Sequence, residues 1–132
     1  MSCARIKLTI NQGETFYKRF EYKDVSGDPI DLSYYHAKMQ IRPTKESSTV
    51  IATISSSFSA DNTGITFTPE SASVVLPPTS GSFAIQISSY SSSLFNFADA
   101  YADLFFYSGS GVTTEADKIF EAIIKLNKSV TR

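Results

Sequence analysis

Hydrophobic and polar residues alternate along most of this chain with a period of two. Residues 4–10 (ARIKLTI) are the clearest case, because Ile6, Leu8 and Ile10 share one face and the residues between them are polar. Side chains of a β-strand point alternately to opposite faces, so this spacing predicts a strand with one solvent-facing side. The same pattern predicts further strands at residues 15–23, 35–42, 50–54, 65–67, 73–76, 82–88 and 100–107.

Three segments depart from simple alternation. Residues 100–107 (AYADLFFY) are apolar on both faces, which is typical of a central strand covered on both sides. Residues 89–97 show no alternation, and we expect a short helical turn or a loop there. Residues 116–128 fit both helical and strand spacing, but their length and the preceding glycine-rich turn favour a strand that pairs with residues 100–107. Lys18 falls on the apolar face of its strand, which indicates a bulge or an edge position.

Turn residues separate these strands about every 8 to 12 positions. The sequence therefore predicts an all-β protein, a single antiparallel β-sandwich of about eight short strands with at most one short helical turn. The length of 132 residues fits one domain, so residues 1–132 are expected to fold as a unit.

Charge and cysteine content narrow the function classes. The net charge is -1 and the twelve basic residues are scattered along the sequence, so we expect no nucleic-acid partner. No apolar run approaches the roughly 20 residues that span a bilayer, and no signal peptide is indicated, so we expect no membrane association. The single Cys3 excludes an internal disulfide, in keeping with synthesis in a reducing cytoplasm.

The residues that carry chemistry are few. His36 is the only histidine, and it lacks the companion ligands that zinc requires. No G-x-S-x-G motif frames a serine, so a small hydrolase built on His36, or a Cys3–His36 dyad, is a minor alternative. The close carboxylate pairs lack calcium-loop spacing and are expected to cap turns or to solvate hairpin ends: Asp28 with Asp31, Asp99 with Asp103, and Glu115 with Asp117. We therefore predict no catalytic, metal or cofactor site.

Aromatic residues are abundant, with ten phenylalanines and seven tyrosines. Sugars stack on aromatic faces, so exposed tyrosines could form a carbohydrate-binding platform. An aromatic protein–protein interface is the favoured alternative. The candidate tyrosines are Tyr17, Tyr22, Tyr34, Tyr35, Tyr90 and Tyr107.

Five short motifs follow one another in a distinctive order. They are INQGETF at 10–16, DVSGDPIDLS at 24–33, AKMQIR at 37–42, YADL at 101–104 and KSVTR at 128–132. This series resembles small tailed-bacteriophage virion proteins and, more distantly, the N-terminal β-sandwich domain of phage baseplate upper proteins. The chain departs from that pattern where Tyr34-Tyr35 replaces a Gly-Tyr turn, in its serine-rich middle and in its final strand.

The resemblance implies an immunoglobulin-like sandwich, a strand as the last element, and neither cofactor nor catalysis. The expected function is a non-enzymatic virion structural protein, made in the host cytoplasm, in the tail, baseplate or fibre-attachment region. It would dock to other virion proteins in multiple copies or as a homo-oligomer. A head-decoration or neck protein is the alternative within this class, and a carbohydrate-binding host-recognition module is the alternative outside it. The candidate interface residues are Arg5, Tyr34, Tyr35, Lys128, Val130 and Arg132.

Overall fold

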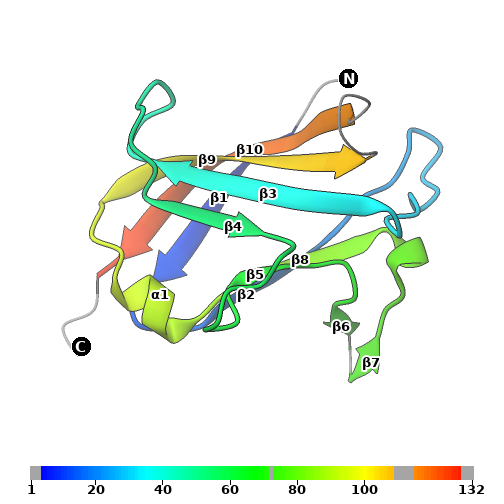
Figure 1. The fold of residues 1–132 in the computed structure, drawn as a ribbon, viewed down its shortest axis with the longest axis horizontal. Coiled ribbons are helices and arrows are strands. Elements are labelled where there is room, and N and C mark those ends of the chain that lie inside the picture. The colour runs from blue at the N-terminus through cyan, green and yellow to red at the C-terminus, as the bar shows by residue number, and fades with distance from the viewer. Residues whose placement is uncertain (1–3, 72, 109–114, 129–132) are drawn as a thin grey trace.

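The computed structural model describes residues 4–71, 73–108 and 115–128, and nearly all of its regular structure is β (Figure 1). It contains an α-helical turn, α1 (Ser89–Ser93), and a 3-10 turn, η1 (Pro78–Ser80). The strands are β1 (Ala4–Asn11), β2 (Phe16–Glu21), β3 (Tyr35–Arg42), β4 (Ala52–Ser55), β5 (Gly64–Thr66), β6 (Glu70–Ser71), β7 (Val74–Val75), β8 (Ser82–Ile87), β9 (Asp99–Ser108) and β10 (Glu115–Asn127).

Eight of these strands form two packed sheets. The larger sheet has the order β1-β10-β9-β3-β4, and the smaller has the order β2-β8-β5. Strands β6 and β7 form a separate hairpin of two residues each beside the smaller sheet (Figure 1). The predicted all-β sandwich is confirmed, and so is the expected number of strands in its two layers.

The strand order is that of an immunoglobulin-like sandwich of the variable type. Strands β2, β8 and β5 take the places of B, E and D in one sheet. Strands β10, β9, β3 and β4 take the places of G, F, C and C′ in the other. The first strand, β1, lies at the edge of this larger sheet, beside β10.

Two details of the expected fold are wrong. The sandwich is not purely antiparallel, because β1 runs parallel to β10, with Leu8 opposite Ile124. Parallel neighbours need a long connection, and here the connection is nearly the whole chain. The structure also has two short helical turns instead of at most one, because η1 forms around Pro78, whose ring fixes φ at a helix-compatible value.

The two segments without a clear strand pattern, and the position of Lys18, are resolved. Residues 115–127 form a strand that pairs with β9, as predicted, and α1 lies within the segment expected to contain a helical turn. Strand β2 is an edge strand, which explains how Lys18 is tolerated there; its ammonium lies 5.9 Å from the ring centroid of Phe20.

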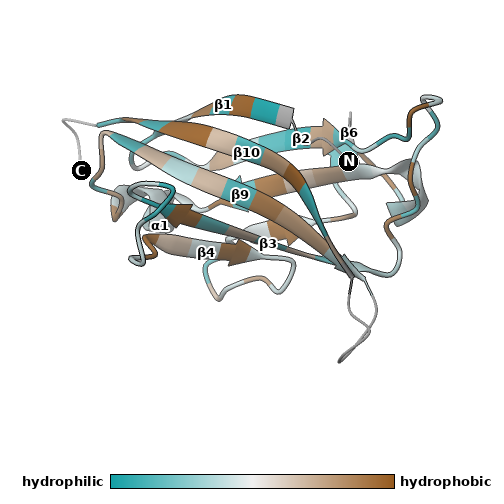
Figure 2. Ribbon diagram, turned by 90° about the horizontal axis from the view of Figure 1, so that it is seen from above, coloured by the Kyte–Doolittle hydropathy of each residue, from teal (hydrophilic) through white to brown (hydrophobic). Residues whose placement is uncertain are grey.

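The core lies between the two sheets. Figure 2, which looks at the molecule from above, shows hydrophobic positions interrupted by hydrophilic ones along the strands of the larger sheet. The inward residues are Leu8, Ile10, Ala37, Met39, Ile41, Ile54, Ala100, Ala102, Leu104, Phe106, Phe120, Ala122, Ile124 and Leu126 from the larger sheet, and Ile65, Phe83, Ile85 and Ile87 from the smaller. In the part of the chain that is described, no helix has the length and apolar character needed to cross a membrane.

Phe106 is the centre of an aromatic cluster that joins the two layers. Its ring centroid lies 5.0 Å from that of Phe83 and 5.4 Å from that of Phe67, both in edge-to-face contact. Tyr22 and Tyr35 approach it at 5.6 Å and 6.0 Å. Edge-to-face pairs contribute beyond the area they bury, so this ring contributes to stability through four neighbours at once.

Replacement of Phe106 by alanine should therefore strongly destabilise the protein. We expect a loss of about 3–5 kcal/mol of unfolding free energy, the range for a buried Phe→Ala change that leaves a cavity. Urea unfolding followed by circular dichroism measures it. The matched control is Tyr34→Ala, at a ring that is 85% exposed, which should change stability by less than about 0.5 kcal/mol. Equal effects of the two changes would contradict the central role of Phe106.

Candidate functional site

The outer face of the larger sheet carries aromatic residues on one of its inner strands, β9. Even-numbered residues 100–106 of β9 are buried in the core, whereas Tyr101, Phe105 and Tyr107 point outward and are half-buried. The sequence predicted a strand that is apolar on both sides because both sides are covered. In the described chain, however, no helix or strand packs over the outer side (Figure 2). An uncovered aromatic row on an inner strand is the most unusual surface feature of the molecule.

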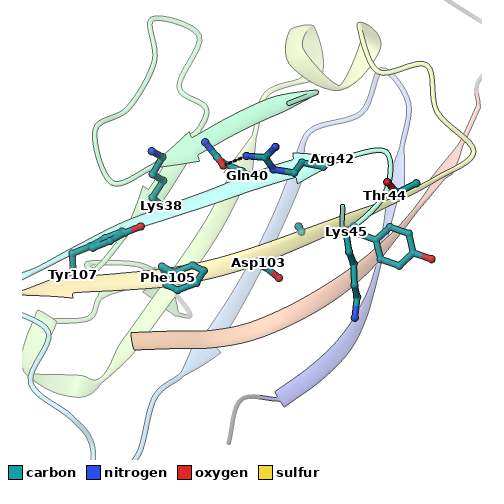
Figure 3. Close-up of a pocket in the computed structure, with 10 residues that line it drawn as sticks. Lys38, Gln40, Arg42, Thr44, Lys45, Asp103, Phe105 and Tyr107 are labelled. Carbon is teal, nitrogen blue, oxygen red and sulfur yellow. Dashed lines mark hydrogen bonds between the residues drawn. The ribbon is translucent and has the colours of Figure 1, made fainter. Parts of the chain in front are cut away.

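These aromatic residues line a shallow hollow between β9 and β3. The rings of Phe105 and Tyr107 stack, with centroids 6.2 Å apart and planes 24° from parallel. Lys38, Gln40 and Arg42 of β3 project on the same face, as Figure 3 shows. The hollow encloses about 160 Å³ and is closed at one end by Thr44 and Lys45.

The polar wall of this hollow is held in place. Nη2 of Arg42 donates to Oε1 of Gln40 at 2.8 Å (Figure 3). Nη1 of Arg42 donates to the carbonyl oxygen of Ser47 at 2.8 Å. A guanidinium fixed by two such bonds loses little further freedom when it meets a partner group.

Basic residues outnumber acidic ones on this face. Seven basic side chains gather there, against three carboxylates on the same face of the strands, those of Asp99, Asp103 and Glu121. The basic residues are Arg5 and Lys7 of β1, Lys38 and Arg42 of β3, Lys45 of the following loop, and Lys118 and Lys125 of β10. The molecule is nearly neutral overall but carries its positive charge asymmetrically.

Glu121 lies among three basic side chains at one side of this face. Its carboxylate accepts a 2.6 Å hydrogen bond from Lys118, lies 3.4 Å from the ammonium of Lys45, and lies 3.6 Å from Nε of Arg5. The hydrogen bonds from Lys118 and then Lys45 hold the pKa of Glu121 below its ordinary value. One carboxylate shared among three cations leaves a local excess of positive charge.

The predicted interface residues fall in different places. Arg5 belongs to this outer face, Tyr34 lies exposed in the turn before β3, and Tyr35 packs against Phe106. Lys128 is exposed just after β10. Val130 and Arg132 lie outside the described residues, as does Cys3.

Tyr101 and Phe105 are site residues that the sequence alone does not single out. The alternation of residues 100–107 placed them on one side of the strand, and the alternation of residues 35–42 did the same for Lys38 and Arg42. What the sequence could not supply was the pairing of these two strands, which sets Lys38 opposite Phe105 and Arg42 opposite Tyr101.

The residues considered for catalysis, metal binding and sugar binding do not form a common site in the described part of the chain. His36 lies exposed on β3, opposite Tyr107. Across residues 4–71, 73–108 and 115–128, no three His, Cys, Asp or Glu side chains converge to hold a metal ion. Asp31 caps a turn, as predicted, by accepting a 2.9 Å bond from the backbone N–H of Ser33.

The tyrosines proposed for a sugar platform are dispersed, with Tyr17 on β2, Tyr90 on α1, and Tyr22 and Tyr35 packed on Phe106.

Asp61 is the centre of the densest hydrogen-bond network in the described chain. Its carboxylate accepts bonds from the hydroxyls of Ser59, Ser88, Ser91 and Thr63. Bonds from Ser59, Ser88 and Ser91 hold the pKa of Asp61 far below its ordinary value. The network ties the turn before β5 to the start of α1, and it explains the serine-rich segments as structural ties.

No protein-family model and no curated protein matches this sequence. The structural class of the protein is therefore assigned from its fold and its outer surface. The protein is an all-β, immunoglobulin-like sandwich whose larger sheet presents a basic and aromatic outer face.

The Asp61 network should make stability fall in acid. A carboxylate whose folded pKa is lowered contributes stability above its unfolded pKa, and that contribution is lost as pH falls below about 4. We expect Asp61→Asn to be less stable than the parent at pH 7, and to lose less stability than the parent between pH 5 and pH 2.5. Urea unfolding across this range measures both.

The matched control is Asp28→Asn, because Asp28 has no described side-chain hydrogen bond. This variant should keep the parent's pH dependence. An Asp61→Asn variant with the parent's stability at pH 7 would show that the network does not stabilise the fold.

Proposed function

We propose that this protein is a non-enzymatic structural component of a tailed-bacteriophage virion, in the tail, baseplate or fibre-attachment region. It works by docking the outer face of its larger sheet onto neighbouring proteins. The observation that carries this proposal is the uncovered aromatic row of Tyr101, Phe105 and Tyr107 on β9.

The composition of this face suits a protein partner. Tyrosine, phenylalanine and arginine are enriched in protein–protein interfaces, and the residues that dominate binding energy are often tyrosine or arginine. Asp103 and Glu121 interrupt the basic residues, so a continuous phosphate backbone would meet repulsion along its path. Ile123, which is 47% exposed, extends the apolar part of the face onto β10.

The size of the face suits a contact that is repeated. Five strands about 4.8 Å apart and about eight residues long cover roughly 20 by 25 Å, or about 500 Å². A stable interface usually buries about 800 Å² on each partner. A single contact through this face would therefore be weak, and a multi-copy particle would strengthen it through avidity.

The place in a virion is supported by the resemblance of the five ordered motifs to phage virion proteins. A head-decoration or neck protein would use the same docking face in the same way. The sandwich itself is suited to a mechanical role, because its edges and loops project from a rigid aromatic core.

A carbohydrate-binding module is the second candidate, and one observation favours it. The nearly parallel rings of Phe105 and Tyr107 line the same hollow as Gln40 and Arg42, which lie opposite Asp103 and Tyr101 further along β9 and offer planar hydrogen-bonding groups to a ligand. Glycan-array binding that disappears in Tyr107→Ser, with incorporation into particles unchanged, would favour this candidate over protein docking.

Electron cryomicroscopy of purified virions tests the proposal directly. We expect the chain to be traceable in the particle, with the outer face of β9 against another protein. Absence of the chain from mature particles would overturn the virion assignment.

A paired substitution tests the docking face. We expect Phe105→Ser with Tyr107→Ser to reduce incorporation into particles at least tenfold, because buried aromatic anchors commonly contribute 2 kcal/mol or more to binding, at about 1.4 kcal/mol per tenfold. The control is Tyr17→Ser with Tyr90→Ser, at two exposed tyrosines on β2 and α1. Normal incorporation of a folded Phe105/Tyr107 variant would show that docking does not use this face.

A further inference from the structure

The loop between β2 and β3 carries an exposed hydrophobic side chain at its tip. Val25 is fully exposed, and in the sequence it lies between Asp24 and Asp28. Figure 1 shows this loop, in light blue, projecting beyond the end of the sandwich. Burial of this valine by a partner would remove its apolar surface from water and so favour binding.

The tip of this loop is rigidly closed. Oδ1 of Asp24 accepts bonds from the backbone N–H groups of Ser26 at 2.9 Å and Asp28 at 3.0 Å. The backbone N–H of Asp24 donates to the carbonyl of Asp28 at 2.9 Å, and Gly27 supplies the left-handed φ of 86° that the turn needs. Val25 is therefore presented in a fixed position without a large entropic cost of binding.

The base of the loop is anchored to the sandwich. The backbone N–H of Tyr22 donates to Gly81 at 2.7 Å, that of Ile30 donates to Tyr22 at 3.1 Å, and that of Leu32 donates to Pro78 at 3.0 Å. Leu32 is buried in the core. The projecting tip thus stands on a support that is continuous with the fold.

The tip and the hollow are chemically complementary. The loop between β2 and β3 contains three carboxylates and one basic residue, Lys23, whose ammonium is paired with Glu21. The hollow combines aromatic rings with Lys38, Arg42 and Lys45 and has one carboxylate, Asp103, in its lining. Within the described chain, Lys7 and Lys38 of the outer face form no ion pair, so these charges are available to a partner. The volume of the hollow, about 160 Å³, is about five times the roughly 30 Å³ that a water molecule occupies. The hollow therefore has room for a small side chain such as that of valine.

We propose that the partner on the outer face is a second copy of this chain, whose loop 24–28 inserts Val25 between β3 and β9. The proposal rests on the docking function proposed above and names its partner. Because the loop of one copy meets the face of the next, the contact is head-to-tail, and it builds a ring or a filament. Pairing of the same face on two copies is disfavoured, because seven basic residues would meet seven others.

Complementary variants test this arrangement. The loop variant carries Val25→Ser and Asp28→Asn, and the face variant carries Lys38→Gln and Phe105→Ser, so neither variant gains a charge that could attract the other. Sedimentation velocity of the full chain over a range of concentrations is the measurement. We expect the parent to form a salt-sensitive series of oligomers, and each variant alone to associate at least tenfold more weakly.

A mixture of the two variants gives the decisive result. The loop variant keeps an intact face and the face variant keeps an intact loop, so one contact can form between them. The mixture should therefore give 1:1 dimers and nothing larger. Tyr90→Ser, on the exposed side of α1, is the control and should assemble as the parent does. Circular dichroism and urea unfolding establish that each variant is folded.

Three results would overturn the proposal. They are a parent chain that stays monomeric at millimolar concentration, a folded loop variant that assembles like the parent, and a mixture that forms no dimer. If the parent is monomeric while Phe105→Ser with Tyr107→Ser still prevents incorporation into particles, the docking function stands and its partner is a different protein.

Discussion

The packing of Phe106 between the two sheets is the contact on which the remaining structure depends. It fixes β9 as an inner strand of the larger sheet and sets which side of that strand is internal. Side chains alternate along a strand, so placing Phe106 inward forces Phe105 and Tyr107 outward. The stability of the core and the character of the outer face are therefore two results of one register, and no shift of β9 could change one without the other.

The parallel pairing of β1 with β10 extends this face to the N-terminal strand. It brings Arg5 beside Glu121, which Lys45 also reaches on the same face, from the end of β3. The charge pattern of the face thus depends on contacts between parts of the chain more than 70 residues apart. A basic surface arises although the sequence itself shows no cluster of basic residues.

Much of the fold was predictable, because alternation reports burial directly. The sequence predicts strands at residues 35–42 and 100–107, and the length of residues 116–128 and the turn before them correctly predict a strand there, which the structure has as Glu115–Asn127. The parallel pair was not predictable, since alternation is the same in parallel and antiparallel strands. The candidate site was predictable only in part for a related reason. The alternation within each strand predicts which residues point outward, but it does not predict which strand pairs with which. The Asp61 network escaped because its serines are separated by up to 32 positions.

Lys18 has a consequence for how the open edge of β2 meets other chains. Exposed edge strands can add to one another without limit, and crowding of identical chains makes such aggregation more probable. An ammonium at the centre of β2, on the side that also carries Phe16 and Phe20, would have to be dehydrated for another strand to pair there. The lysine therefore opposes the addition of a further strand at this open edge of the smaller sheet.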